Sequence, residues 1–190
     1  IRTLERAGAD CIQLEDQVSP KRCGHFNGKE VIEASEMIGK IKAACDARRN
    51  SDTIIMARTD AAAIHGFDAA VERAQQYAEA GADLLFVEAV TSAEHIAALP
   101  QRLKTPQLMN MVIGGKTPIT STEELAKMGY GIVLYANAAL QGAVAGMQRA
   151  LGVLKNEGHI QEDPNLVAPF AERQRLVNKP IWDALEKKYQ

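Results

Sequence analysis

The sequence predicts an α/β fold and, within that class, a (β/α)8 TIM barrel. Apolar runs of strand length alternate with amphipathic runs of helix length along most of the chain. One pattern, a helix end followed by glycine, a buried strand and a carboxylate, occurs at residues 6–15 and again at 79–88. Polar residues follow four of the predicted strands, at the end where barrel proteins assemble their sites. The alternation alone also allows a doubly wound sheet.

Five strands are predicted as short apolar runs. Two of them, at residues 11–15 and 84–88, follow Gly8 and Gly81, because glycine supplies the left-handed residue that ends a helix. Residues 128–135 are a looser third copy of the pattern. Residues 53–57 and 107–111 are strand candidates without the glycine.

Helices are predicted between the strands from apolar residues at helical spacing. Residues 36–48 and 67–78 each carry one apolar face. Ser121, followed by two acids, marks another helix start, and a long helix is expected at 136–155, ending near Gly158. We expect Cys45, on an apolar helix face, and Cys11, inside a strand, to lie in the core.

The number of strands bears on domain organisation. Five strands cannot close a barrel of eight. We therefore expect residues 1–158 to be a partial (β/α)8 barrel comprising about its last five βα units, with about three units preceding Ile1. Residues 159–190 are expected to form a C-terminal helical segment. The apolar stripe around Trp182 suggests that this segment packs against another subunit, as in a homo-oligomer.

Composition excludes several classes of partner. The chain has 190 residues, of which 46% are hydrophobic and 24% charged, and a net charge of −2. This balance gives no reason to expect a nucleic acid or an anionic membrane surface as partner, and no apolar run approaches the roughly 20 residues of a membrane span. Three cysteines without metal-type spacing fit reduced thiols in the cytoplasm. The partner expected is a small molecule.

The run KRCGH at residues 21–25 places a thiol among basic groups. The positive charge of Lys21, Arg22 and His25 favours the thiolate of Cys23, and Gly24 leaves the backbone open to an anionic ligand. The simpler interpretation is a cysteine on a solvated basic turn.

Four polar residues at the predicted strand ends favour the functional interpretation. Glu15, Arg58, Glu88 and Asn110 lie at or just past the C-terminal ends of their strands. Any one of them alone is most simply a solvated loop residue. In a barrel these ends converge, so we expect the four side chains to share one pocket with residues 21–25, which we call the cysteine loop.

Five motifs together resemble the isocitrate lyase and phosphoenolpyruvate mutase superfamily. They are LEDQ at 14–17, KRCGH at 21–25, ARTDA at 57–61, FVEA at 86–89 and NMVIGGKTP at 110–118. The resemblance extends from Ile1 to about Gly158. The cysteine loop is similar to that of the carbon–carbon lyases, such as the 2-methylisocitrate and 2,3-dimethylmalate lyases, and VSPK at 18–21 favours the dimethylmalate type.

The resemblance implies roles for the loop and for the arginine. Cys23 would be the general acid that protonates the enediolate-like product after the bond breaks, from a mobile loop. Gly24 and His25 would help to hold one substrate carboxylate. Arg58 would pair with a second substrate carboxylate, because a planar guanidinium can donate two parallel hydrogen bonds to a carboxylate.

The resemblance also implies a metal. Glu15 would support Mg2+, or alternatively Mn2+, through bound water, with the main metal ligands before Ile1. Glu88 and Asn110 would bind polar groups of the substrate. A hard cation and a guanidinium suit retro-aldol cleavage, because negative charge develops on the α-carboxylate fragment.

The implied activity is that of a magnesium-dependent carbon–carbon lyase, in a homotetramer, that cleaves a small 2-hydroxy di- or tricarboxylate to an α-keto acid and a carboxylic acid. The 2-methylisocitrate lyases carry PLS and then an arginine after the last strand, where this chain has YANA at 135–138 and Gln141. This difference favours a dicarboxylate, although Arg173 could supply a replacement charge. Two alternatives stay open: an oxaloacetate decarboxylase or other 2-keto acid hydrolase of the same superfamily, and a non-catalytic ligand-binding homologue.

Overall fold

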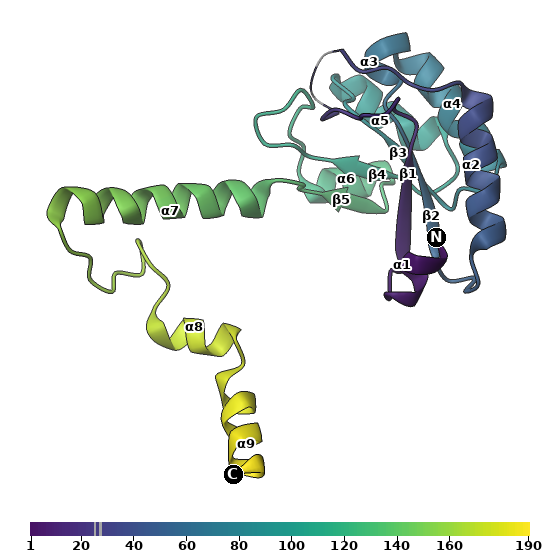
Figure 1. Ribbon diagram of the computed structural model, residues 1–190. Helices are drawn as coiled ribbons and strands as arrows, with labels where there is room; N and C mark the ends of the chain where they lie inside the picture. The colour runs from purple at the N-terminus through teal and green to yellow at the C-terminus, as the bar shows by residue number, and fades with distance from the viewer. Residues whose placement is uncertain (25, 27) are drawn as a thin grey trace. The chain divides into compact units, whose positions relative to one another are not determined.

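The structure, a computed structural model, describes residues 1–24, 26 and 28–190. It divides into two compact units, residues 1–136 and 137–190. The first unit contains parallel strands separated by helices, as Figure 1 shows, so the predicted α/β class is confirmed. The domain boundary at residue 158 stays a prediction.

The described strands follow one another in space in the order of the chain. Strands β1 (Cys11–Glu15), β2 (Ile54–Thr59) and β3 (Leu84–Val87) form one parallel sheet in the order β1-β2-β3, and β4 (Leu108–Asn110) pairs in parallel with β5 (Ile132–Leu134). An isolated parallel bridge between Leu85 and Gln107 links the two sheets. A doubly wound sheet reverses its strand order at a switch point. Because the described strands contain no reversal, their order favours the barrel.

Each predicted helix is present within two residues of its expected bounds. Ser121 caps the N-terminus of α6 (Thr122–Met128) through a capping box with Glu124, and Gly158 ends α7 (Ala138–Glu157) in the left-handed region with φ 74°. No helix of the described ranges is both long and apolar enough to cross a membrane. The helices of the first unit are α1 (Arg2–Arg6), α2 (Ala34–Ala47), α3 (Ala62–His65), α4 (Phe67–Glu79), α5 (Ala93–Arg102) and α6 (Thr122–Met128), and those of the second are α7 (Ala138–Glu157), α8 (Phe170–Leu176) and α9 (Lys179–Tyr189).

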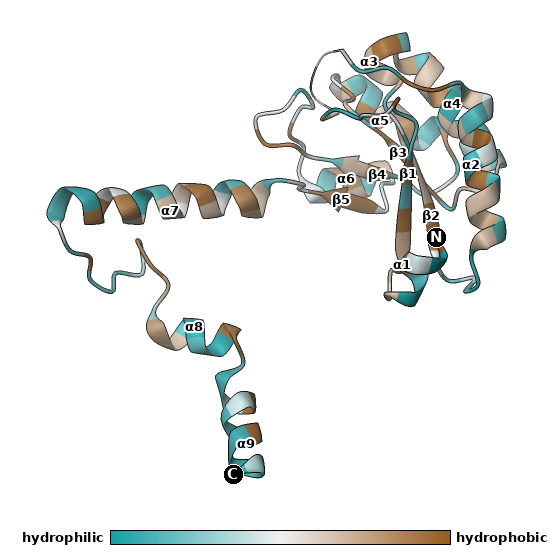
Figure 2. Ribbon diagram, in the orientation of Figure 1, coloured by the Kyte–Doolittle hydropathy of each residue, from teal (hydrophilic) through white to brown (hydrophobic). Residues whose placement is uncertain are grey.

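The core of the first unit lies between the strands and the helices α2, α4 and α5. Met37, Ile41 and Ala44 are buried on one face of α2, at the helical spacing seen in the sequence. Figure 2 shows the same division, with apolar residues concentrated in the strands and with both polar and apolar residues on the helices. The core therefore holds the strands in register and fixes where their C-terminal ends lie.

The expectation that Cys11 lies in the core is wrong. Cys11 is exposed, because it is the first residue of β1, an edge strand of the described sheet, and points away from the face that buries Ile12. Cys45 is half-buried, and its thiol donates to the Gly81 carbonyl at 3.3 Å. Burial raises the pKa of the Cys45 thiol, which makes this thiol a poor nucleophile at neutral pH.

Helix α5 contains a proline, and a tyrosine from another segment compensates for it. Pro100 lacks the N–H that would donate to the carbonyl of Ile96, four residues earlier. The buried hydroxyl of Tyr130 donates to that carbonyl at 2.7 Å. Tyr130 thereby ties α5 to the segment between α6 and β5.

We expect Tyr130→Phe to lower the free energy of unfolding by about 1–3 kcal/mol, because the Ile96 carbonyl loses its donor. Urea unfolding measures the loss, and Tyr135→Phe, at an exposed side chain, is the control. Alanine at position 100 has an N–H, so Pro100→Ala should stabilise the Tyr130→Phe protein more than it stabilises the wild type. Equal effects in the two backgrounds would contradict this explanation.

Candidate active site

The ends of four parallel strands bring the predicted polar residues together. Glu15, the last residue of β1, lies opposite Arg58 of β2 in the ladder. Glu88 directly follows β3, and Asn110 is the last residue of β4. Because the strands are parallel and adjacent, these side chains meet at one edge. Ion pairs and a hydrogen bond link all four.

The Arg58 guanidinium lies at the centre of this cluster. Its Nη2 lies 3.0 Å from Glu88 Oε2 and 3.4 Å from Glu15 Oε1, and its Nε and Nη2 donate to the two oxygens of Asp60 at 2.9 and 3.2 Å. Its Cζ lies 4.9 Å from the centroid of the Phe86 ring. Burial by itself lowers the pKa of Arg58, but the neighbouring carboxylates outweigh it and raise the pKa above its ordinary value. Arg58 is therefore a permanent cation at the centre of the site.

The carboxylates around Arg58 differ in their electrostatics. Burial raises the pKa of Glu15 even though Lys21 and Arg58 act in the opposite direction. Burial also acts to raise the pKa of Asp60, but hydrogen bonds and charge from Arg58 and Lys29 overcome it and lower this pKa. Asp60 is thus held ionised, whereas Glu15 takes up a proton more readily.

Glu88 and Asn110 form a buried pair beside the arginine. Glu88 Oε1 accepts the backbone N–H of Ala89 at 2.8 Å, and Glu88 Oε2 accepts from Asn110 Nδ2 at 3.4 Å. Within the described part of the chain, Asn110 Oδ1 is buried without a hydrogen-bond donor. An unsatisfied buried acceptor costs about 1–3 kcal/mol. A ligand that presents an O–H or N–H here would remove that cost.

The cysteine loop reaches the same edge of the sheet. Gly24 packs directly on the cluster: a Cβ on this residue would overlap Glu88 Cγ and lie 2.5 Å from Arg58 Nη2. Cys23, the preceding residue, is exposed. His25, the remaining predicted residue of the loop, lies outside the described residues. From the sequence we expect the charge of Lys21 to act on the Cys23 thiol. In the structure the Lys21 ammonium pairs with Glu15 Oε2 at 3.0 Å.

Several residues that complete the cluster have no role assigned from the sequence, although Asp16 and Asp60 lie within the motifs LEDQ and ARTDA. Asp16 is fully buried and accepts from the Asp60 backbone N–H at 3.0 Å and from the Tyr77 hydroxyl at 2.8 Å. Arg73 completes this network at 3.5 Å from Asp16 Oδ2. The spacing of two between Arg58 and Asp60 could have identified Asp60, because alternate residues of a strand share a face. The side chains of Arg73 and Tyr77 lie on α4, and no signal in the sequence connects them to the site.

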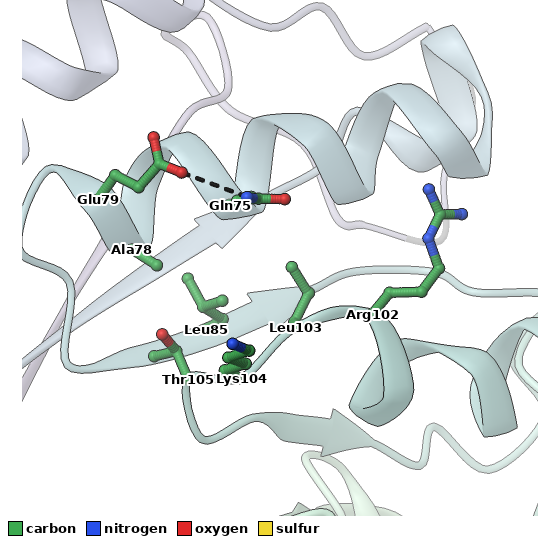
Figure 3. Close-up of a pocket in the computed structure, with 8 residues that line it drawn as sticks. All are labelled: Gln75, Ala78, Glu79, Leu85, Arg102, Leu103, Lys104 and Thr105. Carbon is green, nitrogen blue, oxygen red and sulfur yellow. Dashed lines mark hydrogen bonds between the residues drawn. The ribbon is translucent and has the colours of Figure 1, made fainter.

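One cavity is lined by a residue of the cluster, and a larger cavity is not. A cavity of about 200 Å3 is lined by Glu15, Gln17, Ser19 and Lys21, at the base of the cysteine loop. Figure 3 shows a larger cavity, of about 370 Å3, near the C-terminal ends of α4 and α5. It contains none of the predicted residues, and its lining consists of Gln75, Ala78, Glu79, Leu85, Arg102, Leu103, Lys104 and Thr105. The chemistry of the cluster, rather than cavity size, identifies the candidate site.

Sequence comparison identifies the family. Residues 1–154 match the family model described as Phosphoenolpyruvate phosphomutase. The chain is 45% identical over 189 residues to a 2,3-dimethylmalate lyase of Eubacterium barkeri, covering 100% of this chain and 65% of the relative. It is 46% identical over 158 residues to a 2-methylisocitrate lyase of Aeropyrum pernix, covering 83% and 51%. The chain belongs to the phosphoenolpyruvate mutase/isocitrate lyase superfamily, and it spans half to two thirds of the length of these relatives.

Solved structures agree with this assignment. A crystal structure titled 2,3-dimethylmalate lyase matches with a TM-score of 0.87 and 36% identity, covering 97% of this chain and 64% of that one. An oxaloacetate acetylhydrolase bound to the inhibitor 3,3-difluorooxalacetate matches with a TM-score of 0.87 and 33% identity, covering 99% and 64%. A phosphonopyruvate hydrolase in complex with oxalate and Mg2+ matches with a TM-score of 0.80 and 29% identity, covering 97% and 64%.

We expect Gly24→Ala to displace the cysteine loop, because the new methyl group would collide with Glu88 and Arg58. Hydrogen exchange of the Arg22 amide should accelerate at least about tenfold, the equivalent of 1.4 kcal/mol of local opening. Gly39→Ala is the matched control, since nothing lies within 4 Å of a Cβ at that position. Unchanged exchange at Arg22 would mean that the loop tolerates the methyl group.

Proposed function

We propose that this protein is a magnesium-dependent carbon–carbon lyase that cleaves a small 2-hydroxy dicarboxylate to an α-keto acid and a carboxylic acid. The observation that carries the proposal is the packing of Gly24, from the cysteine loop, on Arg58 and Glu88 at the strand ends. The similarity to a 2,3-dimethylmalate lyase over the whole chain supports the same reaction.

Residues of this chain could bind the substrate of such a reaction and protonate its product. Cleavage breaks the O–H bond of the hydroxyl, whose proton passes to solvent, and the neighbouring carbon–carbon bond. The hydroxyl-bearing carbon becomes a keto group, and the electrons of the broken carbon–carbon bond stay on the carbon next to the other carboxylate. In the proposed mechanism Cys23 then donates a proton to that carbon. Arg58 Nη1, which makes no hydrogen bond with the described residues, is free to bind a substrate carboxylate. Asn110 Oδ1 is proposed to accept the substrate hydroxyl.

A magnesium ion would stabilise the negative charge that develops on the cleaved fragment. The described residues hold no group of three or more His, Cys, Asp or Glu side chains suited to a metal. Glu15 could contact the ion indirectly, through a bound water, because its carboxylate lies at the edge of the site. Mg2+ commonly keeps several of its waters when it binds to a protein. Mn2+, which also takes oxygen ligands, is the alternative ion.

A dicarboxylate of the size of a methylated malate is the proposed substrate. Gln141 stands where the resemblance to 2-methylisocitrate lyases implies an arginine, so the charge for a third carboxylate is missing at that position. We further propose a homo-oligomer, a tetramer as the resemblance implies, working in the cytoplasm. The three free cysteines are consistent with that reducing compartment.

A second candidate function is the decarboxylation or hydrolysis of oxaloacetate or another 2-keto acid. The similarity to an oxaloacetate acetylhydrolase with a TM-score of 0.87 favours it. That reaction would need the metal and Arg58 but not the proton of Cys23.

We expect Cys23→Ser to reduce cleavage by about 10²–10⁴-fold, the usual contribution of a general acid, while the dissociation constant of the substrate changes little. Release of keto acid measures the rate, and isothermal titration measures binding. Cys11→Ser, which alters another exposed thiol, is the control. Full turnover by Cys23→Ser would remove the acid role.

With the full-length polypeptide, and with 2,3-dimethylmalate, 2-methylisocitrate and oxaloacetate as a panel, we expect keto-acid release from the dimethylmalate. EDTA should abolish it and added Mg2+ should restore it. Turnover of oxaloacetate that is indifferent to Cys23→Ser would select the second candidate. A rise in Tm with these ligands but without turnover would indicate a non-catalytic binding homologue.

A further inference from the structure

The main chain is anchored on both sides of Cys23. On one side, the Gln17 side-chain amide makes two hydrogen bonds with the backbone of Arg22. Gln17 Oε1 accepts the Arg22 N–H at 2.9 Å, and Gln17 Nε2 donates to the Arg22 carbonyl at 2.9 Å. On the other side, the Lys29 ammonium donates to the Gly24 carbonyl. The cysteine therefore lies between two residues whose backbones are held by side chains from outside the KRCGH motif.

The Gln17 anchor continues to Arg58. Gln17 Nε2 also donates to Glu15 Oε1 at 2.8 Å, and the same oxygen lies 3.4 Å from Arg58 Nη2. Both N–H groups and the oxygen of this amide are thus used, which leaves Gln17 little freedom to rotate. One short chain of contacts runs from the Arg22 peptide to the guanidinium.

The Lys29 anchor continues to the same guanidinium. Lys29 Nζ lies 2.9 Å from Asp60 Oδ1, and Asp60 holds Arg58 with two hydrogen bonds. The side chains of this pair are 2% and 0% exposed. A buried ammonium must keep its partners, because an unpaired charge in the interior is costly. The exposed Lys21–Glu15 pair, whose lysine side chain is 55% exposed, constrains the loop far less.

We infer that Gln17 and Lys29 are positioning residues that fix the main chain on either side of Cys23 relative to Arg58. Neither side chain needs to touch the reacting atoms. The anchoring itself follows from the contacts alone, whereas its consequence for turnover rests on the proposed lyase function. Loss of either anchor should leave the loop free to move away from the guanidinium, so that the thiol and the bound carboxylate are no longer aligned.

The test compares Gln17→Leu and Lys29→Met, which keep side-chain length while removing the polar contacts, with two matched controls. Gln75→Leu and Lys40→Met make the same changes on the exposed faces of α4 and α2. The direct readout is hydrogen exchange of the Arg22 amide, followed by NMR. Both anchor variants should accelerate it at least about tenfold, with unchanged exchange in the core strand β3, and the controls should not.

Lys29→Met removes the anchor on the other side of the thiol, at the Gly24 carbonyl, and also removes a contact of Asp60, which holds Arg58. Lys29→Arg, which keeps a cation, should recover slow exchange in part. Unchanged exchange at Arg22 in both anchor variants would overturn the proposal. If Lys29→Met does not fold, Gln17→Leu decides the question alone.

Kinetics separate positioning from general stability. With 2,3-dimethylmalate, the anchor variants should lower kcat by about 10–100-fold and change KM by less than threefold, because alignment rather than binding is lost. Fast exchange at Arg22 together with wild-type kcat would overturn the positioning role. If no substrate in the panel is cleaved by the wild type, the proposed function fails, and the exchange rates still decide whether the anchors hold the loop.

Discussion

The ion pairs of the Arg58 guanidinium are the interactions on which the rest of the site depends. One buried cation lies between three carboxylates, those of Glu15, Asp60 and Glu88, which come from the ends of three neighbouring strands. Carboxylates this close repel one another unless a cation separates them, and a buried guanidinium needs acceptors for its N–H groups. The guanidinium and the carboxylates therefore stabilise one another, and the cluster requires the strand register that places Glu15 opposite Arg58.

The cysteine loop adapts to this cluster through the residues that flank its thiol. Gly24 allows the backbone to approach Arg58 and Glu88 more closely than any side chain would. The basic residues of the segment act mainly on carboxylates, since Lys21 pairs with Glu15 and Lys29 with Asp60. The positive charge around the thiol thus also neutralises the acids of the site. The segment that carries Cys23, the proposed proton donor, also carries lysines that supply part of the charge balance of the cluster.

Much of the fold could be predicted because its signals are local. The apolar spacing of α2 and α4 depends on residues within each helix, and so does the capping box at Ser121. Burial could not be predicted in the same way. Cys11 is in a strand, as expected, but its exposure depends on which neighbours the strand has. In α5, likewise, the Ile96 carbonyl that Pro100 leaves without a donor accepts a hydrogen bond from Tyr130, in a later segment of the chain.

The sequence by itself determined the order of the elements, the family, and the four polar residues at the strand ends. It could do so because the spacing of apolar side chains, the positions of glycines and the spacing of motifs are properties of residues close together along the chain. Only the tertiary structure decided which charge pairs with which. Lys29 and Asp60 are separated by 31 positions, and Asp16 and Tyr77 by 61. Such pairs form because parallel strands carry their ends to one edge, and electrostatic partnership follows distance in space rather than distance along the chain.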